Sequence, residues 1–177
     1  MPMGSINFYL VALALCVSSV GCASQQAVPE TETTYPSAKV RIEYSNQDGC
    51  SFSYSPVNFC DEKHINAVST AIAESMPNFN NNYILLTISE RPEYHQKSVV
   101  AIDPSTGFFY PIPIDAYSGT PSDTDPEGKD GKISFGLDSN EVCIDGDILV
   151  YRAITTGNFC FYFQDGKFIG HPTAYMN

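Results

Sequence analysis

The sequence has little positive charge. Nine lysines and arginines stand against twenty aspartates and glutamates, so the net charge is −11 at pH 7. Nucleic-acid binding relies on basic patches that neutralise phosphates, and this composition therefore argues against a nucleic-acid partner. An acidic field favours a basic protein or a cation instead. Acidic side chains also serve simply to keep a domain soluble, which is the alternative interpretation.

The common motifs of catalysis are missing as well. The sequence contains no G-x-S-x-G and no H-E-x-x-H, and its Gly-Lys dipeptides lack the spaced glycines of a phosphate-binding loop. His64 falls in the first turn of a predicted helix, His95 in a polar turn and His171 near the C-terminus. We expect all three on the surface and the protein to have no enzymatic activity. A small hydrolase that uses His64 or His171 is the alternative.

No apolar run is long enough to cross a bilayer, because a transmembrane helix needs about 20 residues and the run from Phe8 to Val20 is shorter. Such a run followed by small residues predicts a secretory signal peptide over residues 1–21. The segment before Cys22 resembles a bacterial lipobox, in which the cysteine is lipidated. That resemblance implies a periplasmic protein anchored to the outer membrane. Ordinary cleavage after Ala23 is the alternative.

The remaining chain divides into a tether and one domain. Residues 22–38 are small and polar and include two prolines, which is typical of a flexible tether. Residues 39–177 are long enough for a single domain with its own core.

The domain carries four cysteines, at Cys50, Cys60, Cys143 and Cys160. An even number in an exported chain predicts disulfides, with three possible connectivities. We favour the local pairs Cys50–Cys60 and Cys143–Cys160. Neither pair has the C-x₂-C spacing of a zinc site, so no metal cluster is expected.

Hydrophobic periodicity predicts a mainly β domain with one helix. Asp61 can cap a helix over residues 62–76, where an apolar stripe recurs at helical spacing and Pro77 ends it. The stripe consists of Ile65, Val68, Ile72 and Met76. Strands are expected at 40–44, 83–88, 98–102, 108–114, 133–137, 147–153, 159–163 and 167–169. Pro111 and Pro113 would shorten the 108–114 strand or confine it to an edge. Short connections favour mostly antiparallel pairing, in a sheet of about six to eight strands.

Residues 115–132 contain no valine, leucine, isoleucine or methionine. Unstructured connections of this length are usually functional or disordered. We expect a finger that enters a partner's cleft through an aromatic anchor, small hydroxyl residues and two acids. These are Tyr117, Ser118, Gly119, Thr120, Ser122, Asp123 and Asp125.

Charge around this finger is strongly acidic, because residues 115–147 carry nine acids and two lysines. Such a field would steer a basic partner. An idle surface loop is one alternative. A calcium loop at Asp123, Asp125 and Glu127 is another, although Ser134 stands where a bidentate glutamate should be.

Residues 78–169 resemble a broad group of small exported bacterial β-domain proteins, mostly of unknown function. The resemblance rests on an Asn-Phe-x-x-x-Tyr strand, an Asp-x-x-Thr-Gly-x-x-Tyr-x-x-Pro hairpin and a Leu-Asp-Ser strand. The matching positions are Asn78, Phe79, Tyr83, Asp103, Thr106, Gly107, Tyr110, Pro113, Leu137, Asp138 and Ser139. This chain has SERPEYHQ at 89–96, where many members of the group carry a cysteine-rich turn.

The architecture is also similar to that of type VI secretion immunity proteins, which plug an incoming cell-wall amidase with a protruding loop. The similarity implies an immunity-type inhibitor with a basic cell-wall hydrolase as its partner and no cofactor. The alternative is a structural or assembly lipoprotein of the envelope without a toxin partner.

Overall fold

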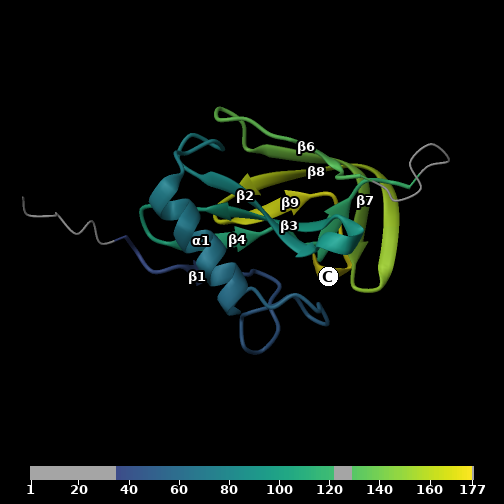
Figure 1. The fold of residues 1–177 in the computed structure, drawn as a ribbon, viewed down its shortest axis with the longest axis horizontal. Coiled ribbons are helices and arrows are strands. Elements are labelled where there is room, and N and C mark those ends of the chain that lie inside the picture. The colour runs from purple at the N-terminus through teal and green to yellow at the C-terminus, as the bar shows by residue number, and fades with distance from the viewer. Residues whose placement is uncertain (1–34, 122–128, 177) are drawn as a thin grey trace, which may run out of the picture. The chain divides into compact units, whose positions relative to one another are not determined.

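A computed structural model describes residues 35–121 and 129–176 (Figure 1). The predicted signal peptide and Cys22 lie outside these residues, as does nearly all of the predicted tether. So do Ser122 and the proposed calcium ligands Asp123, Asp125 and Glu127.

The domain is mainly β with one α-helix, as predicted. The helix α1 spans Glu62–Glu74, and the short 3₁₀ helices η1 and η2 span Pro92–Tyr94 and Ala174–Met176. The strands are β1 (Lys39–Val40), β2 (Ile84–Arg91), β3 (Gln96–Ile102), β4 (Phe108–Pro111), β5 (Ala116–Ser118), β6 (Lys132–Ser134), β7 (Glu141–Val150), β8 (Ala153–Gln164) and β9 (Lys167–Gly170).

The strands form one sheet in the order β1-β4-β3-β5-β7-β8-β9, while β2 pairs with β3 and β6 pairs with β7. Among the described strands only β1 and β4 are parallel, so the sheet is mostly antiparallel as expected. The strand predicted at 40–44 is reduced to the two residues of β1, and the strand predicted at 108–114 ends at Pro111. The strand predicted at 147–153 is wrong at its end, because β7 begins at Glu141 and ends at Val150, and the chain turns at 151–152 into β8. The strand predicted at 159–163 is the second half of β8, which begins at Ala153.

The sheet carries hydrophobic side chains on both faces. Side chains alternate between the faces of a strand, so Val99 and Ala101 of β3 enter one core while Val100 and Ile102 enter the other. The first core is rich in aromatic residues from β8 and β9. The second is covered by α1, which lies against β2 (Figure 1).

Asp61 caps α1 as predicted, because its Oδ1 accepts a hydrogen bond from the backbone N–H of His64 at 2.9 Å. Val68 and Ile72 face the second core. The helix ends earlier than predicted, and Met76 is 84% exposed rather than buried. Ser75 already has extended backbone angles, so Met76 is no longer on the helical face.

Both predicted disulfides are present. Cys143 and Cys160 are directly opposite on β7 and β8, and Cys50–Cys60 closes the segment that precedes α1. Within the two described ranges, no helix is both long and apolar enough to cross a membrane.

Candidate functional site

The predicted finger is shorter than the 115–132 segment, because both of its ends belong to the sheet. Residues Ala116–Ser118 form β5 between β3 and β7, and β6 begins at Lys132. Tyr117 is only 3% exposed and lies in the first core. The prediction that Tyr117 anchors a partner is therefore wrong. An aromatic residue between small polar ones can fill a strand position as well as a loop tip.

The two stems that leave β5 and β6 are in backbone contact. A Cβ added at Gly119 would overlap the carbonyl oxygen of Lys129, and one added at Gly131 would lie 2.5 Å from the carbonyl oxygen of Ser118. Gly146 of β7 approaches the same Ser118 oxygen, and its φ of +145° is a conformation that side chains disfavour. Only glycine permits this close approach of three backbone segments.

Side-chain hydrogen bonds and ion pairs also hold both stems against the neighbouring strands. Thr120 and Thr156 both donate hydrogen bonds to Oδ1 of Asp147, at 2.8 and 2.5 Å. On the other stem, Oδ2 of Asp130 lies 2.8 Å from Nζ of Lys97, and its Oδ1 lies 3.4 Å from Nδ1 of His95. The hydrogen bond from Lys97 lowers the pKa of Asp130.

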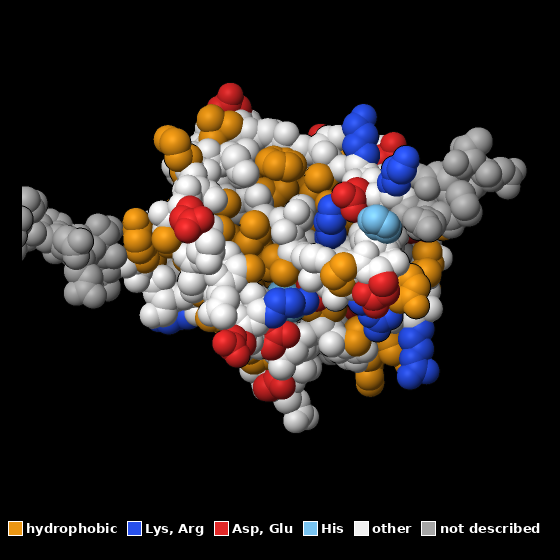
Figure 2. All heavy atoms as spheres, in the orientation of Figure 1, with side chains coloured by type: hydrophobic (Ala, Val, Ile, Leu, Met, Phe, Trp, Pro, Cys, Tyr) orange, Lys and Arg blue, Asp and Glu red, His pale blue; other side chains and the backbone are white. Residues whose placement is uncertain are grey.

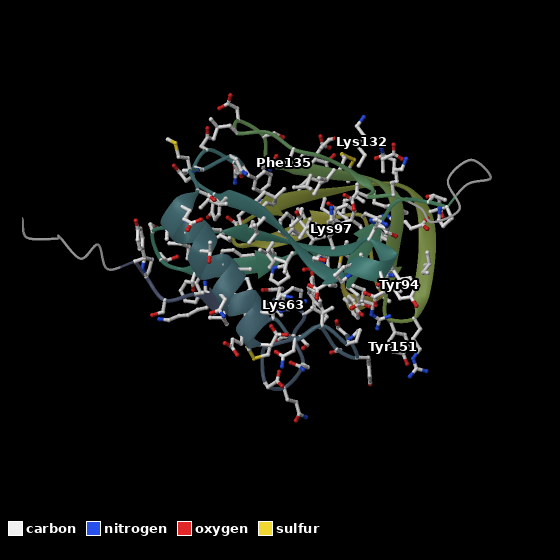
Figure 3. The ribbon with its side chains drawn as sticks, viewed as in Figure 1. Lys63, Tyr94, Lys97, Lys132, Phe135 and Tyr151 are labelled. Atoms are coloured by element: carbon white, nitrogen blue, oxygen red, sulfur yellow. A yellow bond between two sulfur atoms is a disulfide. The ribbon has the colours of Figure 1, made fainter. Side chains whose placement is uncertain are left out.

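We call this arrangement the loop base; it comprises Ser118, Gly119, Thr120, Asp130, Gly131, Gly146 and Asp147. Of the predicted partner-binding residues, Ser118, Gly119 and Thr120 are on the loop base, and Ser118 is half-buried in the β5–β7 ladder. Charged side chains of both signs gather with a histidine over the end of the sheet near β6 and β7 (Figure 2). Lys97 and Lys132 are labelled in Figure 3.

Asp115, the first residue of the predicted finger, is a core residue. It is 1% exposed, and its Oδ1 accepts hydrogen bonds from Oγ of Ser55 at 2.5 Å and from the hydroxyl of Tyr175 at 2.7 Å. Its Oδ2 has no hydrogen-bond partner among the described residues. Burial raises the pKa of the Asp115 carboxyl. This network ties the segment before α1 and the C-terminal η2 to the sheet.

His64 is also buried, at 1% exposure, which corrects the prediction of a surface position. Its Nδ1 lies 2.6 Å from Oδ1 of Asp61, and its Nε2 lies 2.8 Å from Oε1 of Glu90. Glu90 also accepts from Ser98 at 2.5 Å and contacts Lys63, which stands in the first turn of α1 (Figure 3). Both ring nitrogens are thus occupied by structural partners. The only sequence signal for this buried cluster is that the cap residue Asp61 stands three positions before His64.

Sequence reasoning missed a tyrosine-lined site at the end of the β7–β8 hairpin. Tyr54 and Tyr151 approach with ring centroids 5.9 Å apart, and two hollows share both residues. Figure 3 labels Tyr151 at this end of the domain. The residues come from segments nearly a hundred positions apart, which no local pattern links.

Comparisons with protein-family models, curated proteins and solved structures found no match for this chain.

Proposed function

We propose that this protein is a non-catalytic, exported binding protein that inhibits a basic cell-wall-degrading enzyme through the segment that the loop base presents. The observation that carries the proposal is the backbone contact between the stems at Gly119 and Lys129. An idle surface loop needs no such constraint, whereas an inhibitory segment gains affinity when its ends are held in place before binding.

Charge around the loop base supports a basic partner. Asp130 keeps more than half of its side chain exposed although it pairs with Lys97. Asp145 of β7 is exposed as well. Acidic side chains at the rim of an interface accelerate association with a basic protein more than they raise its affinity. Association with the partner should therefore slow markedly as salt concentration rises.

Catalysis by His64 has little support from its surroundings. A general base must reach a proton on a substrate, and both nitrogens of this buried ring already contact carboxylates. The half-buried His171 packs against Phe159 and Phe161, with ring centroids 4.8 and 5.9 Å away. These contacts favour binding over turnover as the function.

The test is affinity capture followed by an inhibition assay. The full chain, exported with its own leader and purified from the envelope, would serve as bait for lysates and secretions of sibling cells. We expect a single basic peptidoglycan hydrolase, whose release of soluble muropeptides is blocked by a stoichiometric amount of bait. Recovery of envelope assembly factors that lack hydrolase activity would overturn the proposal in favour of a structural lipoprotein.

A further inference from the structure

Two exposed tyrosines occupy backbone positions that favour glycine. Tyr54 is the third residue of a turn closed by the Ser55 N–H on the Phe52 carbonyl at 3.0 Å, and its φ is +66°. Tyr151 opens the two-residue turn between β7 and β8 with a φ of +61°. The β8–β9 turn uses Asp165 and Gly166 instead. Side chains at such positions cost about 1–3 kcal/mol and concentrate at functional sites.

The hollow beside this pair is lined almost entirely by residues that carry a hydroxyl group, four of them tyrosines. Its volume is about 370 Å³, within the range of small-molecule sites. The lining residues are Tyr44, Ser45, Ser53, Tyr54, Tyr151, Ala174 and Tyr175. Every one except Ala174 carries a hydroxyl, and each hydroxyl both donates and accepts hydrogen bonds.

Most of these hydroxyls are available to a ligand. Within residues 35–121 and 129–176, only the Tyr175 hydroxyl among them has a side-chain hydrogen-bond partner. It donates to Asp115 and accepts from the backbone N–H of Tyr151 at 2.8 Å. Its ring stacks on Phe52 at 5.0 Å. Tyr175 therefore forms a fixed floor for the hollow and also holds the strained turn at Tyr151.

A second hollow, of about 390 Å³, lies on the same tyrosine pair. Pro56 and Leu149 line it together with the guanidinium groups of Arg91 and Arg152. Arg152 lies over the Tyr151 ring at 5.4 Å, and neither arginine has an ion pair among the described residues. Arg91 also interacts electrostatically with the buried Asp115, and the donor fork of each guanidinium matches a carboxylate.

We propose that this pair of hollows binds a carboxylate-bearing saccharide. One sugar ring lies against Tyr54 and Tyr151, where the flat tyrosine rings cover its C–H face. Its hydroxyls exchange hydrogen bonds with the hydroxyl-lined hollow, and the carboxylate of the neighbouring unit binds Arg91 and Arg152. A proline-rich peptide is the competing ligand for a tyrosine groove, but an uncharged peptide would leave Arg91 and Arg152 without a carboxylate to bind.

Calorimetric titration of the full chain tests this proposal with three probes. They are a neutral N-acetylglucosamine tetramer, a four-sugar strand that alternates N-acetylglucosamine with N-acetylmuramic acid, and a proline-rich decapeptide. We expect the acidic strand to bind at least about tenfold more tightly than the neutral tetramer, with no binding of the peptide. Arg152→Gln should weaken binding of the acidic strand more than binding of the neutral tetramer and so reduce the difference between the two saccharides.

Tyr54→Gly and Tyr151→Gly separate binding from folding, because glycine suits both positions. Each variant should keep or raise the melting temperature and weaken binding of the acidic strand at least about tenfold. Tyr94→Ala, at a tyrosine that is 59% exposed and outside both hollows, is the matched control and should bind normally. The proposal would be overturned if both glycine variants bound the acidic strand as tightly as wild type does, or if only the peptide bound. None of these residues belongs to the loop base, so these variants test saccharide binding separately from the proposed inhibition of a hydrolase.

Discussion

Nε2 of His64 lies 2.8 Å from Oε1 of Glu90, although 26 residues separate them in the chain. The contact joins the first turn of α1 to the end of β2. Burial of the ring opposes its charged form, but hydrogen bonds to Glu90 and Asp61 outweigh burial and raise the pKa of His64 above its ordinary value of 6.5. Burial alone would raise the pKa of the Glu90 carboxyl, but hydrogen bonds from His64, Lys63 and Ser98 outweigh it and lower that pKa below 4.5.

These shifts predict how stability depends on pH. The folded protein holds the His64 proton more tightly than the unfolded chain, so this stabilisation is complete below pH 6.5 and is lost as pH rises through the raised pKa. The Glu90 contribution is present above pH 4.5 and is lost as pH falls through the lowered pKa. The cluster therefore stabilises the domain most between those two values.

His64→Gln should lower the free energy of unfolding by about 3 kcal/mol at pH 6, since it breaks a buried charge pair. The loss should be smaller at pH 9 than at pH 6, because the charge contribution falls as pH rises through the raised pKa of the ring. Urea unfolding at the two pH values measures both quantities. Equal losses at pH 6 and pH 9 would show that the ring acts by packing on Phe59, whose centroid is 5.0 Å away, and not by charge.

Asp115 predicts a pH dependence opposite to that of Glu90. Because burial raises the pKa of its carboxyl above 3.8, the unfolded chain ionises first, and Asp115 contributes less stability as pH rises from that value to the raised pKa. Asp115→Asn keeps an oxygen that can accept from Ser55 and Tyr175 but cannot ionise. We expect its stability relative to wild type to increase between pH 4 and pH 7 in thermal unfolding experiments.

Asp115→Ala is the companion variant, because it removes the acceptor altogether. Leaving the buried Tyr175 hydroxyl without its acceptor should cost about 1–3 kcal/mol. An asparagine variant as unstable as the alanine variant at pH 7 would contradict the role assigned to this carboxyl.

The sequence predicted those parts of the fold that depend on local pattern. The Asp61 cap and the Val68 and Ile72 face follow from neighbouring residues alone, and the structure confirms them. The predicted end of the helix was wrong because Pro77 disfavours helical backbone angles at the residue before it, so the helix ends earlier, at Glu74. The β7–β8 hairpin was underestimated because Asp145 interrupts the apolar signal of β7, and because the first four residues of β8, including Thr155, are all exposed.

The sites could be predicted only in part, because long-range contacts define them. Tyr117 looked like a loop residue, and its burial depends on pairing with Lys97 and Ile148 from two other strands. His64 was predicted to be exposed because it lies in a polar first turn. It is buried because Glu90 of β2, 26 residues away, contacts its ring. Positive φ at Tyr54 and Tyr151 cannot be inferred from residue type, since tyrosine rarely adopts it.

The two disulfides make separate predictions. Cys143–Cys160 and Cys50–Cys60 close segments with sequence separations of 17 and 10. On the chain-entropy account, each should contribute about 3 kcal/mol. Urea unfolding of the double serine variants measures each contribution, and wild type under reductant should lose about the sum of the two. A loss below about 1 kcal/mol for either variant would contradict this estimate.

Gly119→Ala tests whether the loop base matters for inhibition. The added Cβ would overlap the Lys129 carbonyl oxygen, so the two stems must separate. We expect at least about tenfold weaker inhibition of the captured hydrolase, together with a lower melting temperature because the overlapping atom belongs to the backbone and must shift. The matched control is Gly136→Ala, whose Cβ would meet only Ser139 Cβ at 3.9 Å; this variant should inhibit like wild type. If both alanine variants inhibit equally well, the held stems are irrelevant to binding, and the partner must contact another face of the domain.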